Sequence, residues 1–298
     1  MNFRVKTDLA CESMAESGKK FSEAKYRERQ VKNFRFCYLH VEDRADSELL
    51  GRAIGTYLTV ECGGVTSAAE RERRVLSELL ALELRRMTKR ITGRMPTPDF
   101  VVFVAGLGNA ELTADAIGPR TVGMLTATRH LREHDGNLYR EIGCASLSAL
   151  SPGVLGQTGI ETLELLRGTV NHVRPDLVVV IDALAARSCE RLASTVQISD
   201  AGISPGSGVG NRREGVTRDS LGVPVIAIGV PTVVDSATLV YDALTEAGIR
   251  EPSASLERVL ERGQSFFVSP KDSDAVTQCF SKILADAINL AYVGALLD

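Results

Sequence analysis

The 298-residue sequence lacks long apolar runs and lacks a large excess of charge of either sign. No window approaches the ~18 uninterrupted apolar residues of a membrane span, and the N-terminus has no apolar stretch long enough for a signal peptide. The 35 basic and 38 acidic residues leave a net charge of -3. This balance argues against direct nucleic-acid binding through the overall field of the protein. We therefore expect a cytoplasmic protein with no membrane partner.

Cysteine and histidine are sparse and scattered. The six cysteines include no CxxC pair and have no histidine at zinc-like spacing. Cys37 and Cys62 lie in strand-like segments and Cys279 in a helical one, where a cysteine is usually a small buried hydrophobe. His130 and His134 are four residues apart, but HLREH is not the HExxH zinc motif, and we expect the pair to face solvent. The sequence predicts no metal and no cofactor.

The common nucleophile and nucleotide-binding motifs are also absent. No GxSxG occurs, and the glycine-rich segment 204–213 (SPGSGVGNRR) lacks both the P-loop form and the strand-to-helix context of a dinucleotide site. Its three glycines and two arginines would suit either a backbone nest for an anion or a flexible loop that contacts substrate. Both interpretations stay open from the residues alone.

The composition, 44% hydrophobic and 24% charged, is that of a soluble globular protein. Residues 1–30 are polar with little periodicity and predict a mobile or peripheral arm. Strand-like segments follow at 34–41 and 56–61. Residues 67–70 have the form of a capping box, ahead of an amphipathic helix that stops at Gly93.

From residue 100 onward, apolar strands alternate with helices, which indicates a mostly parallel sheet covered on both faces. We predict an α/β fold of three layers, with additional N-terminal strands. The predicted strands are 100–105, 145–150, 177–181, 195–199 and 224–230, and the predicted helices are 115–131, 158–173, 235–246 and 272–296. The expected organisation is an arm over 1–30 and one α/β domain over 31–298, with a surface insertion at 247–265.

Two aspartates follow predicted strands at the edge where open α/β sheets place their ligand sites. Strand 100–105 leads into a Gly106–Asn109 turn and then to Asp115, and strand 177–181 runs directly into Asp182. A carboxylate beside five apolar strand residues is costly to desolvate, so it must be hydrogen-bonded, paired or functional. Two carboxylates facing one cleft would divide acid and base roles, because close approach pushes their pKa values apart. The structural alternative is that Asp115 caps its helix and Asp182 ties down a loop.

Several long blocks of the sequence resemble one family. GLGNAELTADAIGPR, LSPGVLGQTGIET, VVVIDALAARSCERLASTVQISDAGISPGSGVGNRR and LGVPVIAIGVPTVVDSATL are similar to the core of the germination protease of spore-forming bacteria. The N-terminal KTDLA resembles the start of that family. The blocks cover about residues 98–240.

This resemblance implies an endopeptidase that degrades small acid-soluble spore proteins at germination, in the forespore or spore core. It implies a fold similar to hydrogenase-maturation endopeptidases, an atypical aspartic peptidase with essential residues at Asp115 and Asp182, and an active homotetramer. It also implies an inactive precursor with a propeptide of about residues 1–8 that trims itself between Asp8 and Leu9. As contacts for substrate or oxyanion we consider Gly108, Asn109 and Arg187.

Two alternatives to this activity remain. One is a metal-dependent endopeptidase of the hydrogenase-maturation type, although a matching histidine is not evident. The other is a non-catalytic homologue that binds spore proteins and leaves them whole. The segment between Tyr241 and Phe266 is shorter than in the family. This difference bears on docking or assembly more than on the chemistry.

Overall fold

The computed structural model describes residues 7–204, 214–249, 253, 255–256 and 266–294. Its strands form one sheet in the order β1-β2-β3-β7-β8-β6-β4-β5, and β9 pairs with β8. The strands are β1 (Tyr26–Val31), β2 (Phe34–Val41), β3 (Gly55–Glu61), β4 (Val101–Gly106), β5 (Ser146–Leu150), β6 (Leu177–Ala186), β7 (Thr195–Ser199), β8 (Val225–Asp235) and β9 (Phe267–Val268). The helices are α1 (Ala10–Ser17), α2 (Arg44–Leu50), α3 (Glu70–Thr92), η1 (Thr113–Asp115), α4 (Ile117–Val122), α5 (Arg129–His134), α6 (Gly136–Ile142), α7 (Leu155–Thr158), α8 (Thr162–Val173), η2 (Cys189–Arg191), α9 (Arg218–Leu221), α10 (Ser236–Glu246) and α12 (Ser273–Tyr292).

The sheet has a parallel half and an antiparallel half. Strands β5, β4, β6 and β8 run parallel to one another. Strands β1, β2, β3 and β7 are antiparallel to their neighbours, and β7 joins this half to β8. The predicted α/β fold with added N-terminal strands is therefore confirmed.

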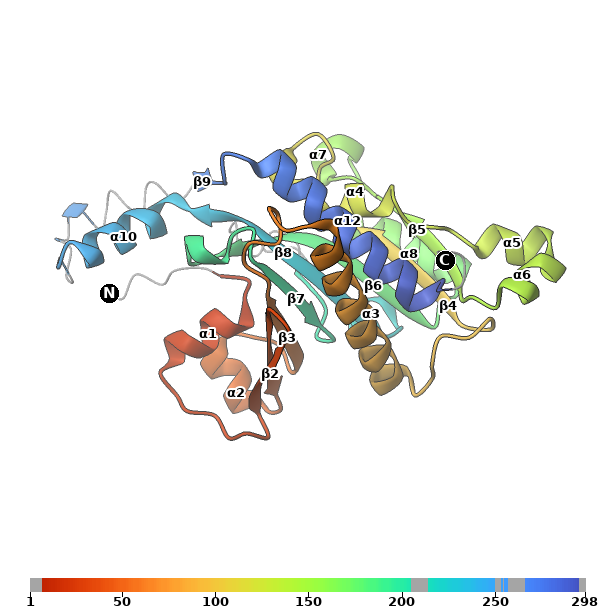
Figure 1. Ribbon diagram of the computed structural model, residues 1–298, viewed down its shortest axis with the longest axis horizontal. Coiled ribbons are helices and arrows are strands. Elements are labelled where there is room, and N and C mark those ends of the chain that lie inside the picture. Colours follow the sequence, from red (N-terminus) through yellow and green to blue (C-terminus); the bar gives the residue numbers. More distant parts are fainter. Residues whose placement is uncertain (1–6, 205–213, 250–252, 254, 257–265, 295–298) are drawn as a thin grey trace.

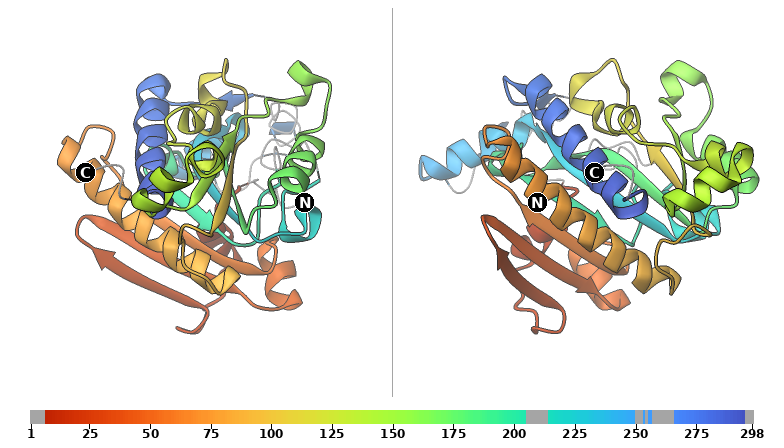
Figure 2. Two further views of the ribbon diagram at one scale, coloured as in Figure 1. Left: turned by 90° about the vertical axis from the view of Figure 1, so that its right-hand side faces the viewer. Right: turned by 45° about the vertical axis from the view of Figure 1, so that its right-hand side comes forward.

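Helices cover both faces of the sheet and complete the three layers. In Figures 1 and 2, α3 and α12 lie side by side across one face, and α8 covers the other. The first face buries Leu80 of α3 and Phe280 of α12, and the second buries Phe103 and Val180 against Leu166 of α8. Burial on both sides explains the near-continuous apolar runs of β4 and β6. None of the helices in the described ranges has the length and apolar composition to cross a bilayer.

Two predicted helical features are wrong in detail. The capping box at 67–70 does not form: α3 begins at Glu70 with no side-chain cap, and the Ser67 hydroxyl donates to the Gly64 carbonyl. The helix does end at Gly93, whose φ is +74°. The single helix predicted over 115–131 is instead divided into η1, α4 and α5. Thr128 draws the chain out of a continuous helix, because its amide and hydroxyl both donate to carbonyls around β5.

The N-terminal segment is part of the folded body, so the prediction of a peripheral arm is wrong for residues 7–17 and 26–30. Leu9 and Ala10 have no exposed surface, and β1 is paired along its whole length with β2. Leu9 belongs to an apolar cluster with Leu184. The low periodicity misled the prediction, although Leu9, Ala10 and Cys11 are buried and Met14 packs beside them. The division of the chain into residues 1–30 and a single domain over 31–298 is not tested by these contacts and stays a prediction.

Strand β6 continues past Asp182, which was expected to follow the end of the strand. It runs to Ala186 and stays paired with β8, with a register shift between Leu184 and Ala185. Strand β4 pairs with β6 only as far as Ile181. Asp182 therefore lies inside a strand, at the point where its pairing with β4 ends. Most of the predicted insertion at 247–265 and the end of the last predicted helix, 295–296, lie outside the described residues.

The fold depends on close backbone packing at Gly118 in α4. A Cβ atom there would lie 2.3 Å from the Leu107 carbonyl oxygen and 2.7 Å from the Ile181 carbonyl oxygen.

We expect Gly118→Ala to lower the free energy of unfolding by about 1–3 kcal/mol, because the backbone of Leu107 and Ile181 must move to make room for the added methyl group. Gly168→Ala is the matched control, since Gly168 is exposed in α8 with open space around it. It should stabilise by about 0.5–1 kcal/mol in urea unfolding. Equal effects of the two substitutions would contradict the packing argument.

Candidate active site

The fold brings Asp115 and Asp182 to the same edge of the sheet. The Leu107 amide, just after β4, donates to the Ile181 carbonyl (2.8 Å), next to Asp182 in the chain. The turn η1, which contains Asp115, packs against β6 and β8. The Thr232 hydroxyl of β8 donates to the Ala114 carbonyl (2.6 Å) and fixes this turn. The turn with Asp115 therefore lies against β6, and the pairing of β6 with β4 ends immediately before Asp182.

Asp115 is held by the loop that precedes it. Its Oδ2 accepts a hydrogen bond from the Asn109 amide (2.7 Å), and α4 has no side-chain cap. The residue at the N-cap of α4 is Ala116, which follows Asp115 in the chain. Gly108 has φ +107°, and a Cβ there would lie 2.0 Å from the Asp115 carbonyl oxygen. Gly108 and Asn109 are thus positioned beside Asp115, where they shape its surroundings.

Asp182 is nearly buried, with 7% of its surface exposed, and its Oδ1 accepts a hydrogen bond from the Ala183 amide (2.9 Å). Strand alternation places its side chain on the same face as Val180 and Leu184. In the sheet register Asp182 is opposite Gly229 of β8, and Gly229 is opposite Gln197 of β7. One row across the sheet therefore runs from Asp182 through a residue without a side chain to Gln197.

A cleft of about 1020 Å³ opens on this face of the sheet. Its lining includes Leu184 and Gly229 from the sheet, Arg52 after α2, and Asp8 from the N-terminal segment. The N-terminal segment therefore forms part of the wall of this cleft, as do Gly229 and Gln197 of the row described above, whereas Asp115 and Asp182 are not among its lining residues.

The backbone around Asp8 is hydrogen-bonded to two strands. The Asp8 amide donates to the Ala185 carbonyl (2.8 Å), and the Ala185 amide donates to the Asp8 carboxylate (2.9 Å). Gln197 Nε2 donates to the Asp8 carbonyl (3.0 Å), and the Ala10 amide donates to Gln197 Oε1 (2.7 Å). The Asp8–Leu9 peptide bond is thus held on both sides.

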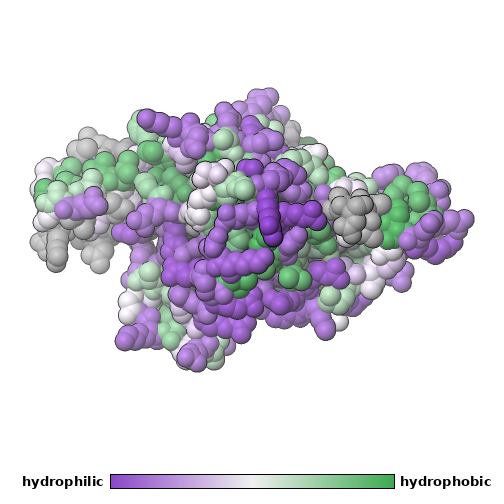
Figure 3. Space-filling model, in the orientation of Figure 1, coloured by the Kyte–Doolittle hydropathy of each residue, from purple (hydrophilic) through white to green (hydrophobic). Residues whose placement is uncertain are grey.

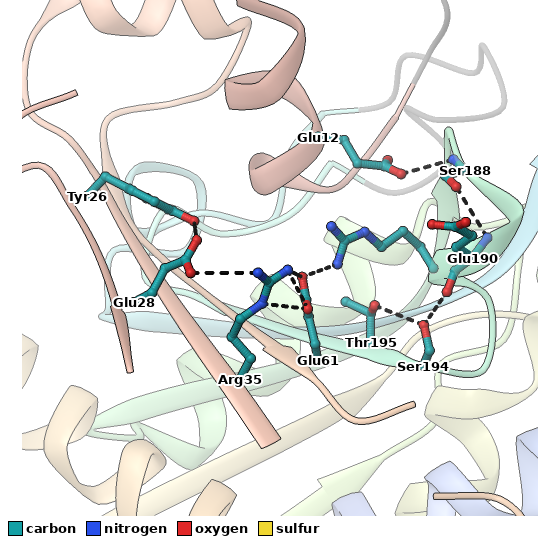
Figure 4. Close-up of polar contacts among 10 residues, drawn as sticks. Glu12, Tyr26, Glu28, Arg35, Glu61, Ser188, Glu190, Ser194 and Thr195 are labelled. Carbon is teal, nitrogen blue, oxygen red and sulfur yellow. Dashed lines mark hydrogen bonds and ion pairs between the residues drawn. The ribbon is translucent and has the colours of Figure 1, made fainter. Parts of the chain in front are cut away.

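Flanking contacts fix the segment at both ends. Arg52 Nη2 donates to the Thr7 carbonyl (2.5 Å). The Glu12 carboxylate accepts from the amides of Arg187 (2.8 Å) and Ser188 (2.9 Å), and Figure 4 shows it reaching Ser188. The Thr7 hydroxyl also donates to Glu12. Sequence reasoning missed Arg52, Glu12 and Gln197, because their roles arise from contacts between distant segments.

The predicted contact residue Arg187 pairs with helix α1. Its Nε lies 2.8 Å from Glu16 Oε1. Its role towards an oxyanion or substrate stays a prediction. The predicted loop 204–213 lies outside the described residues except for Ser204.

Two of the three cysteines expected to be buried are buried, whereas Cys279 is only partly buried. Cys37 and Cys62 are buried, and burial raises the pKa of Cys37 to about 11, far from a reactive thiolate. His130 and His134 are exposed on α5. Among the described residues, no three His, Cys, Asp or Glu side chains form a group that could hold a metal ion.

Comparison with known proteins identifies similar chains. A family model described as germination protease matches residues 5–247. A germination protease of Caldanaerobacter subterraneus is 38% identical over 96% of this chain and 94% of its own length. One of Clostridium acetobutylicum is 36% identical over 98% and 96%. A solved NiFe hydrogenase maturation protease from Thermococcus kodakarensis matches 63% of this chain and 93% of its own, at 18% identity and TM-score 0.31.

The contacts of Glu12 predict how firmly the N-terminal segment is docked. We expect Glu12→Ala to speed amide exchange over residues 7–12 by at least about tenfold, because a hydrogen bond to a charged group is worth about 1.5–3 kcal/mol. Hydrogen-exchange mass spectrometry measures this. Glu23→Ala, at an exposed position of the same segment, is the control and should leave exchange unchanged. Identical exchange in both variants would show that Glu12 does not hold the segment.

Proposed function

This chain belongs to the germination protease family, and we propose that it is the endopeptidase that begins degradation of small acid-soluble spore proteins at germination. Asp115 and Asp182 are proposed as its catalytic pair, in an atypical aspartic mechanism. The observation that carries the proposal is that the turn with Asp115 packs against β6, the strand that contains Asp182 and to which the backbone of Asp8 is hydrogen-bonded.

The proposed chemistry uses one carboxylate and one carboxylic acid. The ionised aspartate takes a proton from water as the water oxygen attacks the scissile carbonyl carbon. The other aspartate donates its proton to the leaving amine as the C–N bond breaks, so the products are a new carboxyl and a new amine. Gly108 and Asn109, next to Asp115, are proposed contacts for the substrate or the oxyanion. The docked Arg187 is proposed as a contact once α1 moves away.

We further propose that the chain is made as a precursor with a propeptide of about residues 1–8. The bond proposed for cleavage is Asp8–Leu9, between an acidic and an apolar residue. Its place in the cleft supports this, because the docked segment fills space that a substrate would need. Self-cleavage would free the Asp8 side of this segment and open part of the cleft.

The proposed partners are small acid-soluble spore proteins and further copies of this chain, assembled as a homotetramer in the forespore or spore core. Helix α10 projects from the body in Figure 1, and Figure 3 shows apolar residues gathered over it. Leu239 and Val240 of this helix are each 42% exposed. An exposed apolar helix of this kind supports assembly with another copy. No nucleic-acid or membrane partner is proposed.

The catalytic pair predicts which substitutions abolish self-cleavage. We expect Asp115→Asn and Asp182→Asn each to slow the appearance of a Leu9 N-terminus by at least about 10³-fold, because an asparagine amide can act neither as the general base nor as the general acid of the reaction. Intact-mass spectrometry under acidic, dehydrating conditions measures this product. Asp219→Asn, an exposed position on α9, is the matched control and should behave as wild type. A mature N-terminus elsewhere would exclude the proposed bond, and normal cleavage by Asp182→Asn would exclude the pair. Retained substrate binding without cleavage in wild type would favour a non-catalytic homologue.

A chelator separates the aspartate pair from a metal-dependent endopeptidase of the maturation type. We expect self-cleavage to change by less than about twofold with excess EDTA, because water activation here rests on carboxylates. The rate is followed by mass spectrometry with and without chelator. Loss of cleavage that one divalent ion restores would favour the metal-dependent alternative.

A further inference from the structure

We propose that Gln197 positions the Asp8–Leu9 peptide bond for hydrolysis and donates a hydrogen bond to the oxyanion formed from the Asp8 carbonyl. The inference rests on the proposed function, since it assigns a residue to the same reaction. It starts from the two hydrogen bonds between Gln197 and the backbone on either side of that bond.

The orientation of the Gln197 amide follows from its partners. The Ala10 amide can only donate, so it faces Oε1, and the Asp8 carbonyl can only accept, so it faces Nε2. The Gln197 side chain thus hydrogen-bonds to two consecutive peptide groups, Asp8–Leu9 through Nε2 and Leu9–Ala10 through Oε1. Because both contacts are to backbone, they do not depend on the side chains of the bound segment.

Gln197 lies in the same row of the sheet as Asp182. The two residues flank Gly229, and adjacent strands are about 4.8 Å apart, so their Cα atoms are separated by roughly 10 Å. Gln197 lines the cleft, and its place in the row puts it on the same face of the sheet as Asp182. Between them, Gly229 has no side chain of its own, and the Leu184 side chain covers it. The row therefore places Gln197 and Asp182 on one face of the sheet, on either side of the Leu184 side chain.

The burial of Gln197 makes its hydrogen bond effective. It is only 8% exposed and lies in a strand whose neighbours Val196 and Ile198 are buried in the core. A donor fixed in a water-poor site stabilises developing negative charge without reorganising at the moment of reaction. As water adds to the Asp8 carbonyl carbon, the C=O bond becomes C–O⁻, and Nε2 already points at that oxygen. When the tetrahedral intermediate collapses, the C–N bond to Leu9 breaks and the carbonyl reforms.

A purely structural role is the competing explanation. Oε1 caps the first amide of α1, whose N-cap residue supplies no side-chain bond. A structural cap requires only the acceptor, whereas the catalytic role also requires the donor. The test must therefore remove the donor and keep the acceptor.

The test uses the full-length chain with Gln197→Glu and Gln197→Leu. Ionised glutamate keeps the acceptor for Ala10 but cannot donate to Asp8, whereas protonated glutamic acid can. We expect Gln197→Leu to slow self-cleavage by about 10²-fold or more at every pH. For Gln197→Glu we expect a similar loss at pH 7, and a rate relative to wild type that rises at least about tenfold as the pH falls to 4. Gln30→Glu, on the exposed strand β1, is the control and should show a constant relative rate.

Amide exchange of Ala10 in the same variants is measured alongside. Gln197→Leu should speed it by at least about tenfold. A relative rate for Gln197→Glu that stays near wild type and constant with pH overturns the proposal, as does unchanged Ala10 exchange in Gln197→Leu. Absence of self-cleavage in wild type would overturn the proposed function instead, and Ala10 exchange would still show whether Gln197 holds the segment.

Discussion

A buried peptide group must find hydrogen-bond partners, and this constraint organises the N-terminal end of the protein. Burying Leu9 and Ala10 removes the adjoining amides and carbonyls from water, and leaving any of them unpaired would cost about 1–3 kcal/mol. Ala185 and Gln197 supply partners from separate strands. The hydrogen bonds that satisfy these buried groups also hold the Asp8–Leu9 peptide bond in place.

The positions of the two aspartates are set by the backbone around β4, β6 and the start of α4. Gly118 of α4 packs closely against the backbone of Leu107, just after β4, and of Ile181, within β6. Asp115 lies two residues before α4 begins at Ile117. Strand β6 carries Asp182 just past its last pairing with β4. The docked segment and the proposed catalytic pair therefore depend on the same extension of β6 and β8. Strands β6 and β8 therefore support both the docked N-terminal segment of the proposed precursor and the proposed catalytic aspartates.

Sequence reasoning predicted the parallel sheet, its two helical layers and the common edge of Asp115 and Asp182, because continuous apolar strands and glycine turns are local signals. It failed at Ser67, where the capping-box pattern matched but the hydroxyl found a nearer carbonyl. It also failed for Leu9, whose burial comes from residues about 175 positions away in the chain. The only local sign of Gln197 was a polar residue in an apolar strand. Its two partners lie nearly 190 residues away, and no spacing rule connects them.

The central claim is that Asp115 and Asp182 together hydrolyse peptide bonds. Its most direct test is mass spectrometry of a small acid-soluble spore protein incubated with the self-processed chain, beside the two asparagine variants prepared to start at Leu9. The account predicts a single cut after an acidic residue and before an apolar one, absent with either variant. An intact spore protein in the presence of a folded, processed chain, or the same cut by both variants, would contradict it.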